Sequence, residues 1–456
     1  MPQYDIEQQK YIERNNTRFD VNMAADADGD LITAGNPAPV KFGDSASVDA
    51  FSRLRVSNPH SVFEASFIYG LRDHIFHPVP TLGGTITENL AEASLSLNVT
   101  STIGSKMQHF STQRINYQPG RSMLCVLTGN FEGHEAGITK RIGLFDDDDG
   151  LFFYSDGTQF GACIRTSTSG TAAENSFPQS SWNLDKMDGT GAYRGPAIDP
   201  TKAHIFIIDF QWLGVGRVRF GLDIDGIVYY VHEVNHANID SIVYMANPNL
   251  FLAYEIENIS SGVGGTMKQI CCAAFSEGGY EKRGVLRSAS TDNATVLCAN
   301  GVLTPIISIR PALLVNGKPN KATMIALNID ILNADNVNSV HWTILEDATI
   351  YTDATEVTPV SFTSHDSVVG DSIAETHVGT PAVGSIISTT PTEAGRAIME
   401  GFAPSGGVRG STVGSDDIGF VMVIPPDGHR DTITLAAMGL GGSANVRAAI
   451  SWREIV

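Results

Sequence analysis

The stretch AHIFIIDFQWLGVGRVRFGLDIDGIVYYVHEV, residues 203–234, decides the expected fold. β-Branched and aromatic residues dominate it, and Asp225-Gly226 forms a hairpin-type turn between VRFGLDI and IVYYVHEV. Alternate residues of a strand share one face, so Phe210 and Trp212 are expected to point into a sandwich core. The alternative is that these aromatic rings, with Phe220, stack on sugars in an exposed groove. Either way, the stretch predicts antiparallel strands.

Strand signals of this kind occupy most of the chain. Runs such as SMLCVLTGNF, RIGLFDDDDGLFFYSDG and NLFLAYEIEN continue to about residue 284, and the polar segment RSASTDNATV precedes a second strand-rich block. We therefore expect an all-β protein built of antiparallel β-sandwich or jelly-roll domains. The predicted parts are an extended docking arm over 1–60, a jelly-roll or lectin-like sandwich over 61–287, and a C-terminal sandwich over 288–456 with long Ser/Thr/Gly/Pro-rich loops.

Charge and cysteine content narrow the classes of partner. The 456 residues include 50 acidic and 30 basic side chains, a net charge of -20 that opposes docking on nucleic acid or an anionic membrane. Five cysteines without a C-x-x-C pair indicate reduced thiols. No secretion signal and no apolar run of about 18 residues is found, so we expect folding in a reducing cytoplasm.

The sequence HEVNH, His232 to His236, matches the zinc-protease pattern H-E-x-x-H. That pattern works on a helix, where the two imidazoles lie about 6 Å apart along the axis. Here the motif begins in a predicted strand, which separates the two histidines by about 13 Å. We therefore expect no zinc at this motif and a structural role for the histidines in a loop network.

Two acidic turns could hold calcium. FDDDDG, Phe145 to Gly150, places four carboxylates between hydrophobic strands, and DADGD, Asp26 to Asp30, starts like an EF-hand loop but has no glutamate at the required place. Asp and Gly are also the ordinary residues of solvated turns. The sequence favours that structural interpretation for both.

No catalytic constellation is evident. A G-x-S-x-G elbow, a P-loop and a G-x-G-x-x-G fingerprint are all missing, whereas a Glu/Asp pair for glycoside cleavage would form only in the fold. We therefore expect a non-enzyme with no catalytic, cofactor-binding or metal-binding residues, and a hydrolase is the lesser alternative.

The segment VDAFSRLRVSNP, Val48 to Pro59, resembles a DAFGRLRVS-like run in structural proteins of tailed bacteriophages and some large DNA viruses. There the run follows a polar arm and opens the globular part. GLFDDDDGLFF, IDFQWLGVGRVRFG and VHEVNHAN are also similar, so the resemblance spans about residues 48–240. Ser52 stands where glycine is common, and the matching residues are Asp49, Ala50, Phe51, Arg53, Leu54, Arg55, Val56 and Ser57.

The resemblance implies a non-enzymatic structural component of a phage virion, a tail, baseplate, neck or capsid-surface protein. Tail or fibre association is favoured; capsid decoration and a carbohydrate-binding host-attachment adhesin are the alternatives. Expected partners are other virion proteins, further copies of the chain, most simply as a trimer, and host-surface carbohydrate, but neither nucleic acid nor membrane. The expected interaction residues are Phe51, Arg53, Leu54, Arg55 and Val56, although this segment could instead be the first strand of the chain's own sandwich.

Overall fold

The computed structural model describes residues 11–14, 17–20, 47–56, 58–190, 195–260, 262–281, 283–352, 358–365, 372–379, 385–390, 392–406, 409–414 and 420–456. These residues form antiparallel β-sheets, with two short 3-10 helices, Leu90–Glu92 and Gln179–Ser181. The predicted fold class is confirmed. Within the described residues, no helix is long and apolar enough to cross a membrane.

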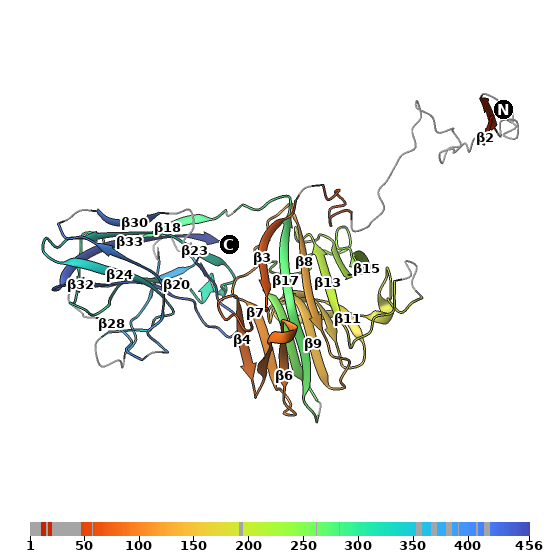
Figure 1. Ribbon diagram of the computed structural model, residues 1–456, viewed down its shortest axis with the longest axis horizontal. Coiled ribbons are helices and arrows are strands. Elements are labelled where there is room, and N and C mark those ends of the chain that lie inside the picture. Colours follow the sequence, from red (N-terminus) through yellow and green to blue (C-terminus); the bar gives the residue numbers. More distant parts are fainter. Residues whose placement is uncertain are drawn as a thin grey trace.

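The first sandwich consists of two facing sheets (Figure 1). One has seven strands in the order β12 (Ala173–Pro178), β11 (Phe160–Thr166), β10 (Gly150–Ser155), β9 (Ile138–Phe145), β16 (Leu252–Asn258), β7 (Lys106–Ser111) and β4 (Phe76–Thr81). The other follows the order β15 (Ile227–Val234), β14 (Val218–Ile224), β13 (Ala203–Phe210), β8 (Ser122–Asn130), β17 (Gly265–Glu277), β6 (Ser94–Val99) and β5 (Thr85–Asn89), and β3 (His60–Ser66) pairs with β17.

The second sandwich begins after β17 and is built from two six-stranded sheets. One contains β18 (Val285–Ser290), β33 (Ala444–Ile455), β23 (Thr323–Asn333) and β30 (Arg409–Gly414), with β19 (Val296–Cys298) on β33 and β31 (Val421–Met422) on β23. The other follows the order β26 (Thr363–Ser364), β27 (Ala374–Val378), β20 (Thr304–Pro311), β32 (Ile433–Leu440), β24 (Ser339–Glu346) and β29 (Arg396–Ala403). Three small pairs complete the described strands: β1 (Tyr11–Arg14) with β2 (Thr17–Asp20), β21 (Leu314–Val315) with β22 (Lys318–Pro319), and β25 (Ile350–Tyr351) with β28 (Ile386–Ile387).

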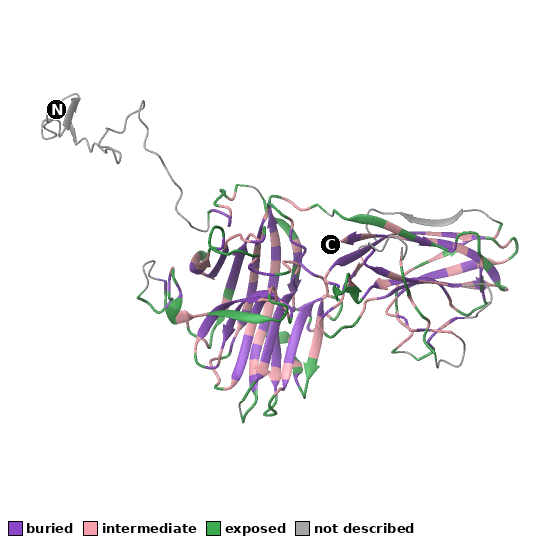
Figure 2. Ribbon diagram, turned by 180° about the vertical axis from the view of Figure 1, so that it is seen from behind, coloured by how far each residue is buried: buried purple, intermediate pink, exposed green. Residues whose placement is uncertain are grey.

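Each sandwich has its own apolar core between its two sheets, where Figure 2 shows the buried residues. On β16 the core side is formed by Leu252, Tyr254 and Ile256, which are fully buried. The residues between them therefore point to the outer face of the seven-stranded sheet. This alternation places polar side chains on that face.

The two sandwiches are joined by direct contacts. Val421 and Val423 of the second sandwich pack on an apolar patch of the seven-stranded sheet that includes Phe110 and Phe251. The Thr323 hydroxyl donates a hydrogen bond of 3.0 Å to Asn116 Oδ1 across the junction. Part of the outer face of the seven-stranded sheet is thereby covered, and the part nearer Glu255 stays open.

Candidate functional site

The segment around the predicted interaction residues lies on the chain's own first sandwich. Val48 and Ala50 are buried, and residues 49–53 form a tight turn in which the Asp49 carboxylate accepts the amide of Arg53 at 2.8 Å. Ser52 has a φ of 61°, in the left-handed region. Glycine adopts this region without steric cost, so a glycine would also fit this position.

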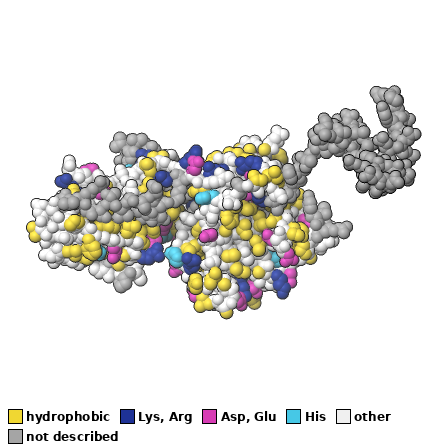
Figure 3. All heavy atoms as spheres, turned by 45° about the horizontal axis from the view of Figure 1, so that its top comes forward, with side chains coloured by type: hydrophobic (Ala, Val, Ile, Leu, Met, Phe, Trp, Pro, Cys, Tyr) yellow, Lys and Arg dark blue, Asp and Glu magenta, His cyan; other side chains and the backbone are white. Residues whose placement is uncertain are grey.

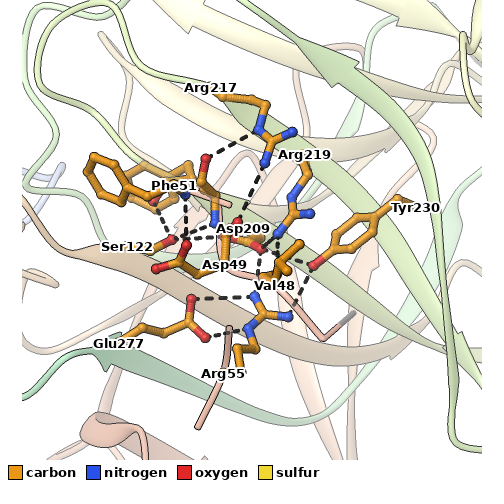
Figure 4. Close-up of polar contacts among 12 residues, drawn as sticks. Val48, Asp49, Phe51, Arg55, Ser122, Asp209, Arg217, Arg219, Tyr230 and Glu277 are labelled. Atoms are coloured by element: carbon orange, nitrogen blue, oxygen red, sulfur yellow. Dashed lines mark hydrogen bonds and ion pairs between the residues drawn. The ribbon is translucent and has the colours of Figure 1, made fainter. Parts of the chain in front are cut away.

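Arg55 belongs to a charge cluster within the first sandwich (Figure 4). Its guanidinium pairs with Asp209 of β13 at 2.6 Å and with Glu277 at the end of β17 at 2.5 Å. Asp209 also pairs with Arg219 of β14, and both side chains are fully buried. This cluster ties the N-terminal segment to the eight-stranded sheet.

The other predicted interaction residues lie nearer the surface. Val56 is 87% exposed and Leu54 42% exposed, whereas Phe51 is half-buried beneath the guanidinium of Arg53. A role for these side chains in binding a partner stays a prediction. Ser57 lies outside the described residues, as does most of the arm before residue 47.

The zinc-protease motif begins on a strand, as predicted. β15 contains His232, which accepts the amide of Asn183 at 3.2 Å, whereas His236 follows the strand and donates from Nδ1 to Gly216 O at 2.7 Å. The His236 ring stacks on Tyr244. The two histidines therefore belong to separate loop contacts rather than to one metal site.

The acidic loop Asp146 to Asp149 differs from a solvated turn. Asp146 and Asp149 are buried, and Lys321 Nζ of the second sandwich lies 3.1 Å from Asp146 Oδ2 and 3.3 Å from Asp149 Oδ2. Burial acts to raise the pKa of Asp146, but the charges of Arg114 and Lys321 lower it below its ordinary value. The loop is thus a docking site for the second sandwich. The other candidate calcium loop, residues 26–30, lies outside the described residues.

The aromatic strand is part of the core, as predicted. Phe210 is buried against Tyr117, and Trp212 packs on the same core while its indole nitrogen donates to Met245 O at 2.9 Å. The alternative of an exposed sugar-stacking groove on this strand does not hold.

Charged side chains gather instead on the open part of the outer face of the seven-stranded sheet. Glu255 and Glu257 of β16 point to this face because they alternate with the core residues. In the strand register, Glu255 lies opposite Arg141 of β9 and Gln108 of β7, and Glu257 lies opposite Lys106. They belong to a pocket of about 310 Å³ lined by Lys106, Arg141, Asp147, Arg165, Ala172, Glu174, Glu255 and Glu257.

One arginine joins Glu255 and Glu257 of this pocket. Arg141 Nη1 contacts Glu255 Oε1 and lies 3.5 Å from Glu257 Oε2, so the facing oxygens are held close together. Gln108 Nε2 donates to the second oxygen of Glu255 at 2.6 Å. The side chain of Glu255 is only 3% exposed, whereas that of Glu257 is 31% exposed. The pair thus has one fixed and one accessible member.

The charges around Glu255 keep it ionised. Burial alone would raise its pKa, but Arg141, Lys106 and Arg165 outweigh burial and lower the pKa below the ordinary value. Glu174 of β12 adds another carboxylate, 2.7 Å from Arg165 Nη2 and 3.7 Å from Arg141 Nη2. The pocket therefore presents anions and hydrogen-bond donors together.

The two glutamates were missed from the sequence, although the alternation in LAYEIEN marks them as sharing one face. What could not be seen was their setting, because Arg141 lies 114 residues from Glu255 along the chain.

A chain with this fold and this pocket is a two-sandwich β-protein with a polar site on one sheet. No known family model matches the sequence, and no curated protein is similar to it. Among solved structures, a β-glucanase of Bacillus licheniformis is 11% identical with a TM-score of 0.31, covering 48% of this chain and 98% of its own. A family 16 glycosyl hydrolase of Mycobacterium smegmatis is 12% identical with a TM-score of 0.31, and the match covers 47% of this chain and 99% of the hydrolase. A protein of unknown function from Shewanella oneidensis is 10% identical with a TM-score of 0.33, and the match covers 51% of this chain and 94% of that protein.

These comparisons correct the functional expectation. The prediction of a non-enzymatic structural component of a phage virion is corrected by this finding: solved structures with a similar sandwich include glycoside hydrolases, so the fold does not favour a non-enzyme. At such low identity the similarity concerns the fold alone. The activity of this chain has to be argued from its own side chains.

Proposed function

We propose that the chain is a carbohydrate-active protein that binds a polysaccharide over the open outer face of the seven-stranded sheet and cleaves a glycosidic bond there. The carboxylate pair Glu255 and Glu257, joined by Arg141 in a pocket, is the observation that carries the proposal. Glycoside cleavage requires two carboxyl groups beside one bond, and retaining enzymes place them about 5 Å apart. Because both glutamates contact one nitrogen of Arg141, their facing oxygens fit that spacing.

The environments of the two glutamates suggest different roles. Glu255 is ionised and fixed by Arg141 and Gln108, which suits the nucleophile. Glu257 is more exposed and suits the proton donor, which must reach the leaving oxygen. Lys106 and Arg165 in the pocket wall can donate hydrogen bonds to sugar hydroxyls.

The proposed reaction has two steps. Glu257 gives its proton to the glycosidic oxygen while the C1–O bond breaks, and a carboxylate oxygen of Glu255 bonds to C1 as the alcohol leaves. Water then loses a proton to Glu257 and attacks C1, which releases Glu255 and a sugar of unchanged anomeric configuration. Atoms and charge balance without a cofactor.

The test is reducing-end release by the full chain from a panel of soluble polysaccharides of differing linkage. We expect turnover of at least one, with Glu255→Gln and Glu257→Gln each lowering kcat about 100-fold or more. Glu400→Gln, an exposed glutamate of the second sandwich, is the control and should retain full activity. Binding without cleavage, no activity on any polysaccharide, or full activity in both pocket variants would each refute the proposal.

A further inference from the structure

A second polar cluster lies in a cavity between the two sandwiches, about 840 Å³ in volume. The first sandwich contributes His77 to its wall, and the second contributes Asp347, His429 and Asp431. Figure 3 shows histidine and charged side chains where the two sandwiches meet. None of these residues belongs to the glutamate pocket, so a role for this cluster does not depend on the proposed function.

Three of these side chains converge at one point. One donor atom each from Asp347, His429 and Asp431 lies within 4.8 Å of the other two. His429 Nε2 is 3.3 Å from Asp347 Oδ2. Two carboxylates and an imidazole at this separation form a ligand set for a divalent transition-metal ion.

The backbone fixes the two carboxylates in this position. Asp347 Oδ1 accepts the amide of Thr432 at 2.9 Å, which leaves Oδ2 toward His429. Asp431 Oδ2 accepts the amide of Val423, also at 2.9 Å. One oxygen of each carboxylate is thus held by a backbone amide, and the three side chains keep the separation of metal ligands.

Arg396, an arginine of the same cavity wall, is paired with Glu346.

We propose that Asp347, His429 and Asp431 bind one divalent transition-metal ion, with water from the cavity completing its coordination. Zn²⁺ suits three such ligands and an open position. Two of the three ligands, His429 and Asp431, lie on the loop that also carries Asp427, and His77 of β4 contacts this loop through an Nε2–Oδ2 distance of 2.8 Å to Asp427. Metal binding would therefore hold in place the loop through which the second sandwich contacts β4.

The test uses the full chain after treatment with EDTA and its removal. Titration with ZnCl2 by calorimetry should give one ion per chain, and the melting temperature should rise with Zn²⁺ because the metal binds the folded state. Asp431→Asn and His429→Gln should each weaken Zn²⁺ binding at least tenfold. His74→Gln, which changes an exposed histidine of the same cavity wall, is the matched control and should bind as the wild type does.

Three results would overturn the site: no Zn²⁺ bound by the wild-type chain, Zn²⁺ bound equally by both ligand variants, or Ca²⁺ bound more tightly than Zn²⁺. The last would show that the imidazole is not a ligand, because calcium prefers oxygen donors. Unchanged cooperative unfolding of the same samples in urea would show that the failure concerns the metal site alone.

Discussion

Replacing Asp209 by asparagine tests whether the buried charge cluster holds the N-terminal segment on the first sandwich. Asp209 accepts hydrogen bonds from Tyr230 at 2.9 Å and Ser122 at 3.0 Å, and it pairs with Arg55 and Arg219. An amide keeps the shape of the side chain but removes its charge. The change therefore isolates the electrostatic contribution.

The expected loss in the free energy of unfolding follows from the surroundings of each arginine. Arg219 is fully buried, and Asp209 is its ion-pair partner; its other contacts include Val48 O, at 2.8 Å, and the Tyr230 ring. Removing the charge of one partner from a buried ion pair costs about 3–5 kcal/mol. Arg55 adds little, because it is 20% exposed and keeps Glu277 as a partner. We expect the free energy of unfolding of the first sandwich to fall by about 3–5 kcal/mol.

Urea unfolding at pH 7 followed by tryptophan fluorescence measures this difference, since Trp182 and Trp212 lie in the first sandwich. Limited trypsin digestion should also cleave faster after Arg53, in the turn that the cluster anchors. Asp225→Asn, in the exposed β14–β15 turn, is the control and should change stability by less than about 0.5 kcal/mol. A loss below about 1 kcal/mol in the Asp209 variant would refute the electrostatic argument.

Two further predictions concern the junction and the core. Lys321→Met should lower the free energy of unfolding by about 2 kcal/mol, which is less than the loss of a fully buried pair because Arg114 still neutralises Asp146. Calorimetry should then show the two sandwiches unfolding in separate steps. Unchanged cooperativity, or an equal effect of the exposed Lys318→Met, would contradict this. Burial lowers the pKa of His109 to about 4. Between pH 4 and pH 6.5 the unfolded chain therefore binds a proton that the folded chain does not. The contribution of His109 to stability is complete above pH 6.5 and is lost as the pH falls toward 4. His109→Gln should reduce that pH dependence in urea unfolding, and a profile identical to the wild type would show that another group is responsible.

The sequence predicted the strands well because their pattern is local. The turn at Asp225-Gly226, the core position of Phe210 and the strand geometry of HEVNH all depend on neighbouring residues, and the structure confirms each. The acidic loop was predicted less well, since its partner Lys321 lies 175 residues away from Asp146. Local composition indicates a turn but not what will bind it.

The same limit applies to both candidate sites. Asp347 directly follows β24, and His429 lies in the loop before β32. These two strands are far apart in sequence but paired in the sheet, which brings the two side chains together. No spacing rule connects them. The expectations that concern other molecules stay predictions. They are the trimer, the virion partners and location, and the partner-binding role of Phe51, Arg53, Leu54, Arg55 and Val56.

Lys321 gives the acidic loop a counter-ion that is covalently part of the chain. A bound calcium ion would leave when a chelator was added, and the junction would then respond to the ionic composition of the medium. An amine carried on the adjoining domain cannot be removed in that way, and its local concentration is set by the fold. Contact between the sandwiches at this loop should therefore persist in EDTA and weaken only when the lysine is changed or the domains separate.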